Sequence, residues 1–210
     1  MAWLENVCIE DKNIHNERLE LTDNNSLYFV GPNLELRDCT LVLKVTARRL
    51  HILGARFINC TIEIKQALKN HLAWRTATLK GCRIKGQMSG CDFGHSPEWT
   101  SSMSFGEGFI EDCDFTEAQL DGCRFLGCDP STLRFPKWPC FTILDPIGRS
   151  QELARMPWPG DISPVVMEGS AQDPSATVAV TYHAPTLAKE FGTTPEAILA
   201  VLETCEGVIY

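Results

Sequence analysis

The 210-residue sequence has no long apolar run. No stretch approaches the roughly 18 apolar residues that a membrane-spanning helix needs. Residues 2–10 mix short apolar stretches with Glu5 and Glu10, so they lack the apolar centre of a secretory signal. Apolar residues still make up 44% of the chain, which is enough for a substantial core. We therefore expect a soluble, cytoplasmic protein that forms one ordinary domain with an appendage and makes no contact with a membrane.

The sequence also lacks the local patterns of common catalytic and metal sites. The five histidines are scattered along the chain, at His15, His51, His71, His95 and His183. None has a neighbour in the sequence that would indicate a catalytic triad, and no cysteine pair has the C-x2-C spacing of a zinc site. The glycine-rich residues 106–108 lack the lysine of a phosphate-binding loop. We therefore expect no enzyme activity, no cofactor and no metal.

Ten cysteines are present, and six of them share one pattern. Each of the six is followed two positions later by Leu, Ile or Phe, in the pairs Cys39/Leu41, Cys60/Ile62, Cys82/Ile84, Cys91/Phe93, Cys113/Phe115 and Cys123/Phe125. The intervals from Cys39 to Cys60, from Cys60 to Cys82 and from Cys91 to Cys113 are 21, 22 and 22 residues. A thiol at an inward position behaves as a small apolar group. We therefore expect reduced packing cysteines rather than disulfides or a zinc site.

A second apolar period of five residues runs inside the longer one, through Ile110, Phe115, Leu120 and Phe125. Neither an α-helix, at 3.6 residues, nor a strand, at 2, produces this period. The two nested periods predict a solenoid with four sides of about five residues, in which apolar residues of successive coils lie above one another. The columns of this interpretation are Leu36/Phe57/Leu79, Leu41/Ile62/Ile84 and Ile52/Trp74.

The residues of this pattern resemble the pentapeptide-repeat family, whose units read roughly Ala or Cys, Asp or Asn, Leu or Phe, and then two free positions. The nearest matches begin at Cys91, Cys113, Ala118 and Cys123. The resemblance implies a right-handed, quadrilateral parallel β-helix over about residues 26–130. The expected fold class is mainly β, with a small α/β appendage at the C-terminus. The five-residue period is interrupted at residues 43–50, 66–72 and 94–108. These interruptions predict loops that bulge from the corners.

Three segments flank the predicted β-helix. Residues 1–25 mix apolar and polar positions and predict an N-terminal cap of short strands. Seven prolines between Pro130 and Pro164 predict that residues 131–176 wrap the coils or cover their far end, with a linker at residues 168–176. Residues 177–210 predict a unit made of one strand and two helices.

The two C-terminal helices have clear sequence signals. Residues 185–191 precede Gly192, which suits a helix end, and Thr194 followed by Pro195 suits a helix start. The pair resembles the opening of a helix-turn-helix module, but its only basic residue is Lys189, among four glutamates. Because DNA phosphates would repel such a pair, we expect it to serve in packing or as a homodimer contact.

The net charge of −8 conceals a segregated distribution. Residues 40–90 carry ten basic and one acidic side chain, whereas residues 91–130 carry one basic and nine acidic ones. The basic stretch is interpreted as a solvated flank, because its aromatic residues belong to the core and cannot stack on bases, so nucleic acid is not an expected partner. Asp92 and Asp114, one coil length apart in the sequence, are predicted to lie on neighbouring coils.

The acidic stretch is either a solvated face or a docking surface for a basic protein. The predicted partner-binding residues are Asp92, Glu107, Glu111, Asp112, Asp114, Glu117 and Asp121. A rigid solenoid with segregated charge suits a non-enzymatic protein-binding protein. The family resemblance favours an immunity protein that binds and inhibits a cognate bacterial toxin, such as a basic nuclease. The alternatives are a DNA-mimicking topoisomerase inhibitor or protector, which the basic middle section disfavours, and an adaptor for a secreted effector.

Overall fold

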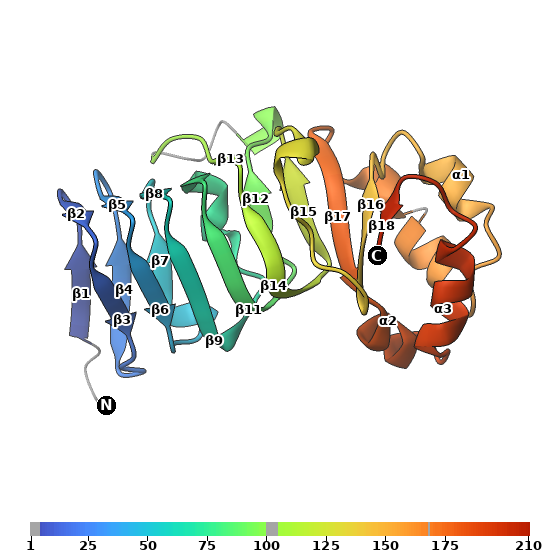
Figure 1. Ribbon diagram of the computed structural model, residues 1–210, viewed down its shortest axis with the longest axis horizontal. Coiled ribbons are helices and arrows are strands. Elements are labelled where there is room, and N and C mark those ends of the chain that lie inside the picture. The colour runs from blue at the N-terminus through green and yellow to red at the C-terminus, as the bar shows by residue number, and fades with distance from the viewer. Residues whose placement is uncertain (1–4, 100–104, 168) are drawn as a thin grey trace.

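A computed structural model of the chain describes residues 5–99, 105–167 and 169–210. Most of the chain winds into a mainly β, parallel solenoid of about four turns, whose coils follow one another along the long axis (Figure 1). The first three coils each have three strands: β1 (Glu5–Ile9), β2 (Asn13–His15) and β3 (Arg18–Leu21); β4 (Ser26–Val30), β5 (Glu35–Arg37) and β6 (Thr40–Leu43); β7 (Leu50–Ile52), β8 (Arg56–Ile58) and β9 (Thr61–Lys69). Residues 5–21, assigned from the sequence to a cap, thus form the first coil.

The later coils are less regular. They contain η2 (Leu72–Thr76), β10 (Thr78–Lys80), β11 (Arg83–Ser89), β12 (Asp92–Gly94), η3 (Pro97–Trp99), β13 (Phe109–Glu111), β14 (Asp114–Asp121) and β15 (Cys123–Leu126). Three parallel sheets result, which we name sheet 1 (β1-β4-β7), sheet 2 (β2-β5-β8-β10-β13) and sheet 3 (β3-β6-β9-β11-β14). β12 and β15 begin a fourth, mixed sheet, sheet 4, that covers the far end of the stack.

The strand register confirms two of the predicted columns. In sheet 2, Leu36 lies opposite Phe57, and Phe57 lies opposite Leu79. Sheet 3 shows the same order for Leu41, Ile62 and Ile84, so these coils stack at the interval that the sequence predicts. Beyond β10 the sequence interval between stacked residues becomes longer. Leu79 lies opposite Ile110, because the segment around η3 is inserted before β13.

Aromatic rings fill the interior of the later coils. Trp74 is buried there, but it lies on η2 rather than on a strand that pairs with Ile52. Its ring centroid is 5.9 Å from that of Phe93, which in turn stacks on Phe125 at 5.4 Å and meets Phe115 edge-on at 5.2 Å. Offset and edge-on ring contacts of this kind stabilise a core beyond the area that they bury.

The six cysteines of the repeat pattern, which we call the ladder cysteines, are buried free thiols, as predicted. Along one corner the Sγ atoms of Cys60, Cys82 and Cys113 lie 3.2, 3.2 and 3.5 Å from the carbonyl oxygens of Leu36, Phe57 and Leu79, each on the preceding coil. Cys91 and Cys123 belong to a separate corner, where their thiols face Leu68 and Met88. The interval from Cys91 to Cys113 therefore does not mark a column.

The corner between sheets 2 and 3 depends on a left-handed backbone. The residue directly before each cysteine of that corner has a positive φ: Asp38 (55°), Asn59 (53°), Gly81 (64°) and Asp112 (54°). Asn, Asp and Gly tolerate this conformation better than other residues do. The backbone conformation therefore explains why Asn, Asp or Gly occupies these positions, and this includes Asp112.

We expect the buried Cys60 and Cys82 to resist a thiol reagent in the native protein, whereas the exposed Cys8 reacts quickly. The thiolate is the reactive form, and a hydrogen bond with Cys113 together with burial raises the pKa of Cys82 to about 12. Peptide mapping after brief labelling, with and without urea, measures the difference. Fast native labelling of Cys60 or Cys82 would mean that the corner is open to solvent.

The C-terminal third closes the stack by joining its last sheet. β17 (Thr177–His183) pairs antiparallel with β15 on one side and with β16 (Cys140–Leu144) on the other, and β18 (Val208–Ile209) pairs with β16. Between β16 and β17 lie α1 (Ser150–Ala154), η5 (Ser163–Met167) and η6 (Gly169–Gln172), and η4 (Pro130–Thr132) precedes them. The proline-rich segment and the final residues thus form one end cap rather than separate units (Figure 1).

Both C-terminal helices form close to their expected positions. α2 (Ala184–Glu190) is followed by Gly192, whose φ is 65°. α3 (Pro195–Leu202) begins at Thr194, whose hydroxyl accepts a hydrogen bond from the backbone N–H of Ala197 at 3.2 Å. The apolar face of α3 is buried in a second core under sheet 4, so it packs within the chain.

Candidate partner-binding surface

Asp92 lies inside the protein and not on the predicted acidic surface. Its side chain is completely buried and forms ion pairs with Arg75 and Arg124. The Nε of Arg75 donates to Oδ2 at 2.9 Å, and the Nε of Arg124 donates to Oδ1 at 2.7 Å. Arg124 also binds Asp173 at 2.7 Å, and these carboxylates raise the pKa of Arg124. The prediction that Asp92 contacts a partner is therefore wrong, because the carboxylate links η2, sheet 4 and the end cap.

Asp92 and Asp114 are not neighbours, contrary to the sequence interpretation. Asp92 lies opposite Arg124 in sheet 4, whereas Asp114 lies opposite Arg83 in sheet 3. The insertion before β13 lengthens the last coil, so two residues that are one regular coil length apart fall on different faces. Each of the two aspartates thus faces an arginine on the neighbouring strand, and cross-strand pairs of opposite charge are mildly stabilising.

The other six predicted residues lie on or beside the last parallel coil. Glu111, Asp112 and Asp114 follow one another around the corner from β13 to β14, and Glu117 lies further along β14. At the end of that strand, Asp121 accepts a hydrogen bond from the backbone N–H of His183 at 3.1 Å, which ties it to the end cap. Asp112 and Glu117 are exposed, whereas Glu111, Asp114 and Asp121 are partly buried.

Cations from the preceding coil pair with much of this acidic group. Lys80 Nζ lies 2.5 Å from Glu111, and Lys85 Nζ lies 3.0 Å from Glu117. Both pairs are cross-strand neighbours, because the basic section of the chain supplies β10 and β11 and the acidic section supplies β13 and β14. The hydrogen bond and charge of Glu111 raise the pKa of Lys80. These lysines could not be assigned to the surface from the sequence, because the regular coil interval does not bring them beside these acids.

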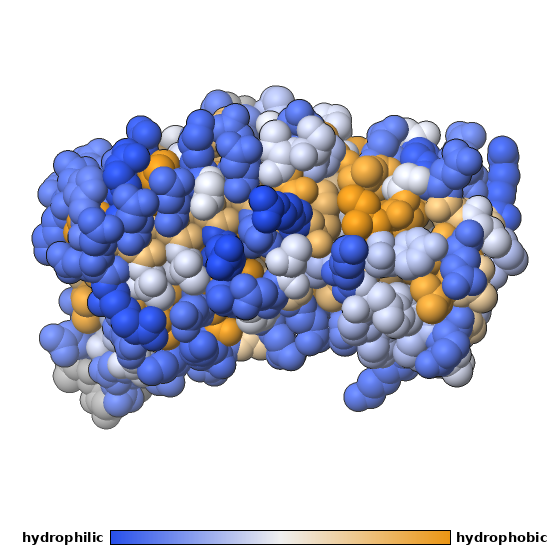
Figure 2. Space-filling view, viewed as in Figure 1, coloured by the Kyte–Doolittle hydropathy of each residue, from blue (hydrophilic) through white to orange (hydrophobic). Residues whose placement is uncertain are grey.

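The same alternation of charge continues down the stack. In sheet 2, Glu35 pairs with Arg37 and Arg56, and in sheet 3, Glu20 pairs with Lys44 and Glu63 with Lys65. Figure 2 shows hydrophilic side chains over much of the viewed face of the coils, with apolar ones between them and over the β16 and β17 end. The outer faces therefore carry mixed charge rather than one acidic and one basic pole.

Two acidic residues of the surface, Asp112 and Glu107, have no lysine or arginine paired with their carboxylates among the described residues. Asp112 is exposed and forms no ion pair within the described part of the chain. Glu107 precedes β13 and lies 3.6 Å from the Nε2 of His95, with its side chain 63% exposed. Asp114 is held by Thr116, which donates to it at 2.6 Å, and more loosely by Arg134 at 3.6 Å. Negative charge is thus left over near the edge of β13.

Exposed aromatic residues lie beside these carboxylates. Phe109 is 45% exposed on β13, two positions before Glu111 and therefore on the same side of the strand. Phe105, four positions before Phe109 in the sequence, is 43% exposed. Exposed aromatic rings next to polar groups are typical of interface anchors. Phe109 is not among the residues predicted from the sequence, because those were chosen for their negative charge.

The fold and this surface together define a parallel β-solenoid with charged outer faces and one aromatic-acidic edge. The chain matches no model of a known protein family, and a search of curated proteins finds no match either. None of the helices in residues 5–99, 105–167 and 169–210 has the length and apolar character needed to cross a bilayer.

Proposed function

We propose that this chain is a non-enzymatic protein-binding protein that docks a basic partner through the edge around β13 and β14. The observation that carries the proposal is the exposed Phe109 beside Glu111 and the uncompensated Asp112. Buried aromatic anchors within a polar rim supply most of the binding free energy of many interfaces. A stack of paired strands supports this edge, so little ordering entropy is lost on binding.

The partner that we propose is a bacterial toxin with a basic nuclease domain, which makes the chain an immunity protein. Negative charge at Glu107, Asp112 and Glu117 would steer such a partner and occupy the surface that binds nucleic-acid phosphates. A DNA mimic would need a long surface of uniform negative charge, and the ion pairs of sheets 2 and 3 do not favour it. An effector adaptor would use the same edge but would leave its partner active.

The test uses the protein encoded by the neighbouring open reading frame as the partner. Replacing Phe109 with Ala is expected to weaken binding by about 2 kcal/mol, roughly thirtyfold, because an interface anchor is truncated. Tyr210→Ala is the matched control, because Tyr210 is similarly exposed, at 40%, but lies at the C-terminus beyond the coils. Surface plasmon resonance measures both affinities, and equal affinities for the two variants would contradict the proposed edge.

The charged part of the edge is tested by association rates. Asp112→Asn combined with Glu117→Gln is expected to slow association several-fold at low salt and to have little effect at high salt. Asparagine retains the left-handed backbone at position 112, so the corner keeps its conformation. Inhibition of the partner's nuclease activity distinguishes an immunity protein from an adaptor, and full activity in the complex would contradict the immunity assignment.

A further inference from the structure

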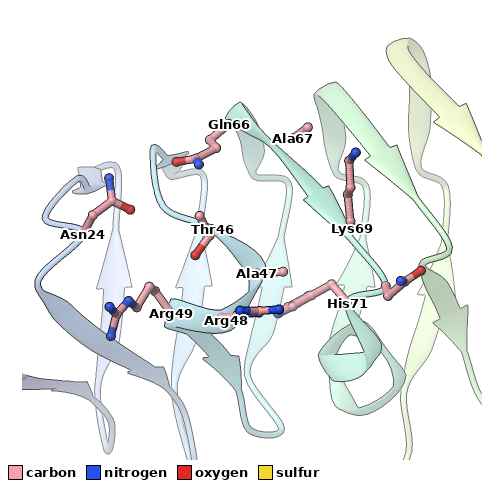
Figure 3. A pocket seen from close by; sticks show the side chains of 10 residues that line it. Asn24, Thr46, Ala47, Arg48, Arg49, Gln66, Ala67, Lys69 and His71 are labelled. Atoms are coloured by element: carbon pink, nitrogen blue, oxygen red, sulfur yellow. The ribbon is translucent and has the colours of Figure 1, made fainter.

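Two irregular segments of consecutive coils enclose a pocket at the corner between sheets 3 and 1. The first segment holds η1 (Ala47–Arg49), and the second runs from the end of β9 to His71. The pocket has a volume of about 1100 Å³, and Asn24 from the preceding coil also lines it (Figure 3). Both segments break the five-residue period of the sequence, and η1 lies where the chain passes from sheet 3 to sheet 1.

The pocket is basic, although the chain as a whole is acidic. Arg48, Arg49 and Lys69 line it, and no acidic residue does. None of the three forms an ion pair within the part of the chain that the structure describes. Lys44 and Lys65, which lie close to them in the sequence, do form such pairs, with Glu20 at 3.1 Å and Glu63 at 2.9 Å.

The positions of these cations suit a ligand held between two walls. In Figure 3, Arg49 extends toward the side of Asn24 and Arg48 toward the side of His71, while Lys69 comes from the end of β9. The acidic Asp23 lies near Arg49, but its carboxylate is already occupied by the backbone of Asn25 and the hydroxyl of Ser26, both at 2.8 Å. Asp23 therefore offsets part of the charge of Arg49, whereas Arg48 and Lys69 have no acidic residue beside them in the pocket lining.

His71 forms part of the buried wall of the pocket. It lines the pocket, only 4% of it is exposed, and its Nδ1 has no hydrogen-bond partner. Its Nε2 lies 2.9 Å from the carbonyl oxygen of Leu50 and must donate to it, so Nδ1 carries the lone pair of a neutral ring. Burial lowers the pKa of His71, and the nearby His51 lowers it further. A buried polar atom without a partner is unusual in a folded protein.

We propose that this pocket binds a small molecule that carries a phosphate group. The guanidinium groups of Arg48 and Arg49 can each donate two parallel hydrogen bonds to phosphate oxygens, and Lys69 adds a point charge. The side-chain amides of Asn24 and Asn70 are available to the neutral part of such a ligand. The site lies on the early coils, away from β13 and β14, and does not depend on the proposed protein-binding function.

Isothermal titration calorimetry with inorganic pyrophosphate tests the site. The triple variant Arg48→Gln, Arg49→Gln, Lys69→Gln is expected to bind at least about a hundredfold more weakly than the wild type, because charge-assisted hydrogen bonds are lost. The matched control is Lys137→Gln, Arg155→Gln, Lys189→Gln, which removes the same charge from three exposed cations outside the pocket. Equal weakening in both variants, or a wild-type Kd above about 1 mM, would overturn the proposal.

Other probes define the chemistry of the ligand. Ribose 5-phosphate represents a phosphate ester and pyrophosphate a free polyphosphate, and binding of either one that requires the pocket cations supports the site. Citrate has a similar charge but no phosphate, so citrate binding as tight as that of pyrophosphate would overturn the phosphate assignment. The ring ¹⁵N signals of His71 are expected to shift on addition of pyrophosphate, whereas those of His15 on sheet 2 stay in place. Unchanged His71 signals would contradict binding in this pocket.

Discussion

Replacing Phe93 with Ala is expected to lower the free energy of unfolding by about 3–5 kcal/mol. Phe93 is completely buried and contacts Trp74, Phe115 and Phe125 through its ring. These rings come from η2, β14 and β15, so the substitution opens a cavity where the later parts of the stack meet. Urea denaturation followed by tryptophan fluorescence measures the loss.

Phe109→Ala is the matched control for this prediction. It removes the same atoms from the same stack, but Phe109 is 45% exposed, so we expect a change of less than about 1 kcal/mol. Similar losses of stability in the two variants would contradict the inward position of Phe93 and the outward position of Phe109.

Asp92→Asn is expected to destabilise the protein by about 3–5 kcal/mol, because it removes one partner from a buried charge network. Asparagine has the size of aspartate but leaves Arg75 and Arg124, whose side chains are 16% and 27% exposed, without a full countercharge. Arg75 also lies over the ring of Trp99 at 3.8 Å, so the segment around η3 depends on the same carboxylate. Chemical denaturation measures the effect.

Glu117→Gln provides the comparison for Asp92. Its carboxylate pairs with Lys85 at the surface, where the loss of an ion pair costs less than about 1 kcal/mol. In a double-mutant cycle, Arg124→Gln should cost less in the Asp92→Asn background than in the wild type. Additive effects of the two substitutions, or a loss at Asp92 no larger than that at Glu117, would contradict the network.

The regular part of the fold could be predicted from the sequence because it has a repeating physical cause. Each coil needs an apolar residue at each inward position, so Leu36, Phe57 and Leu79 recur at the coil length and identify the stack. The helix that starts at Thr194 was equally predictable, because a capping hydroxyl and Pro195 act locally. The position of β17 between β15 and β16 could not be predicted, because this pairing joins segments that are distant in the sequence and have no local signal for it.

The candidate surface was only partly predictable. A period in the sequence gives a residue's place on a coil, but it does not say which coil is adjacent once an insertion intervenes. The segment around η3 therefore placed Asp92 beside Arg124 rather than beside Asp114. The same insertion brought Lys80 next to Glu111, so the acidic stretch proved to be half of a set of ion pairs. Composition showed the two charged sections but not that they would lie side by side.

The position of the proposed edge depends most on the pairing of β10 with β13 across the inserted segment. Cross-linking measures this pairing directly. In the variant Lys80→Cys, Glu111→Cys the two Cα atoms lie on adjacent strands roughly 4.8 Å apart, within the range for a disulfide. Mass spectrometry of the oxidised protein should therefore identify a disulfide between positions 80 and 111, and no disulfide between positions 80 and 117 in the control Lys80→Cys, Glu117→Cys. A disulfide in the control variant and none between positions 80 and 111 would contradict the stacking of these coils.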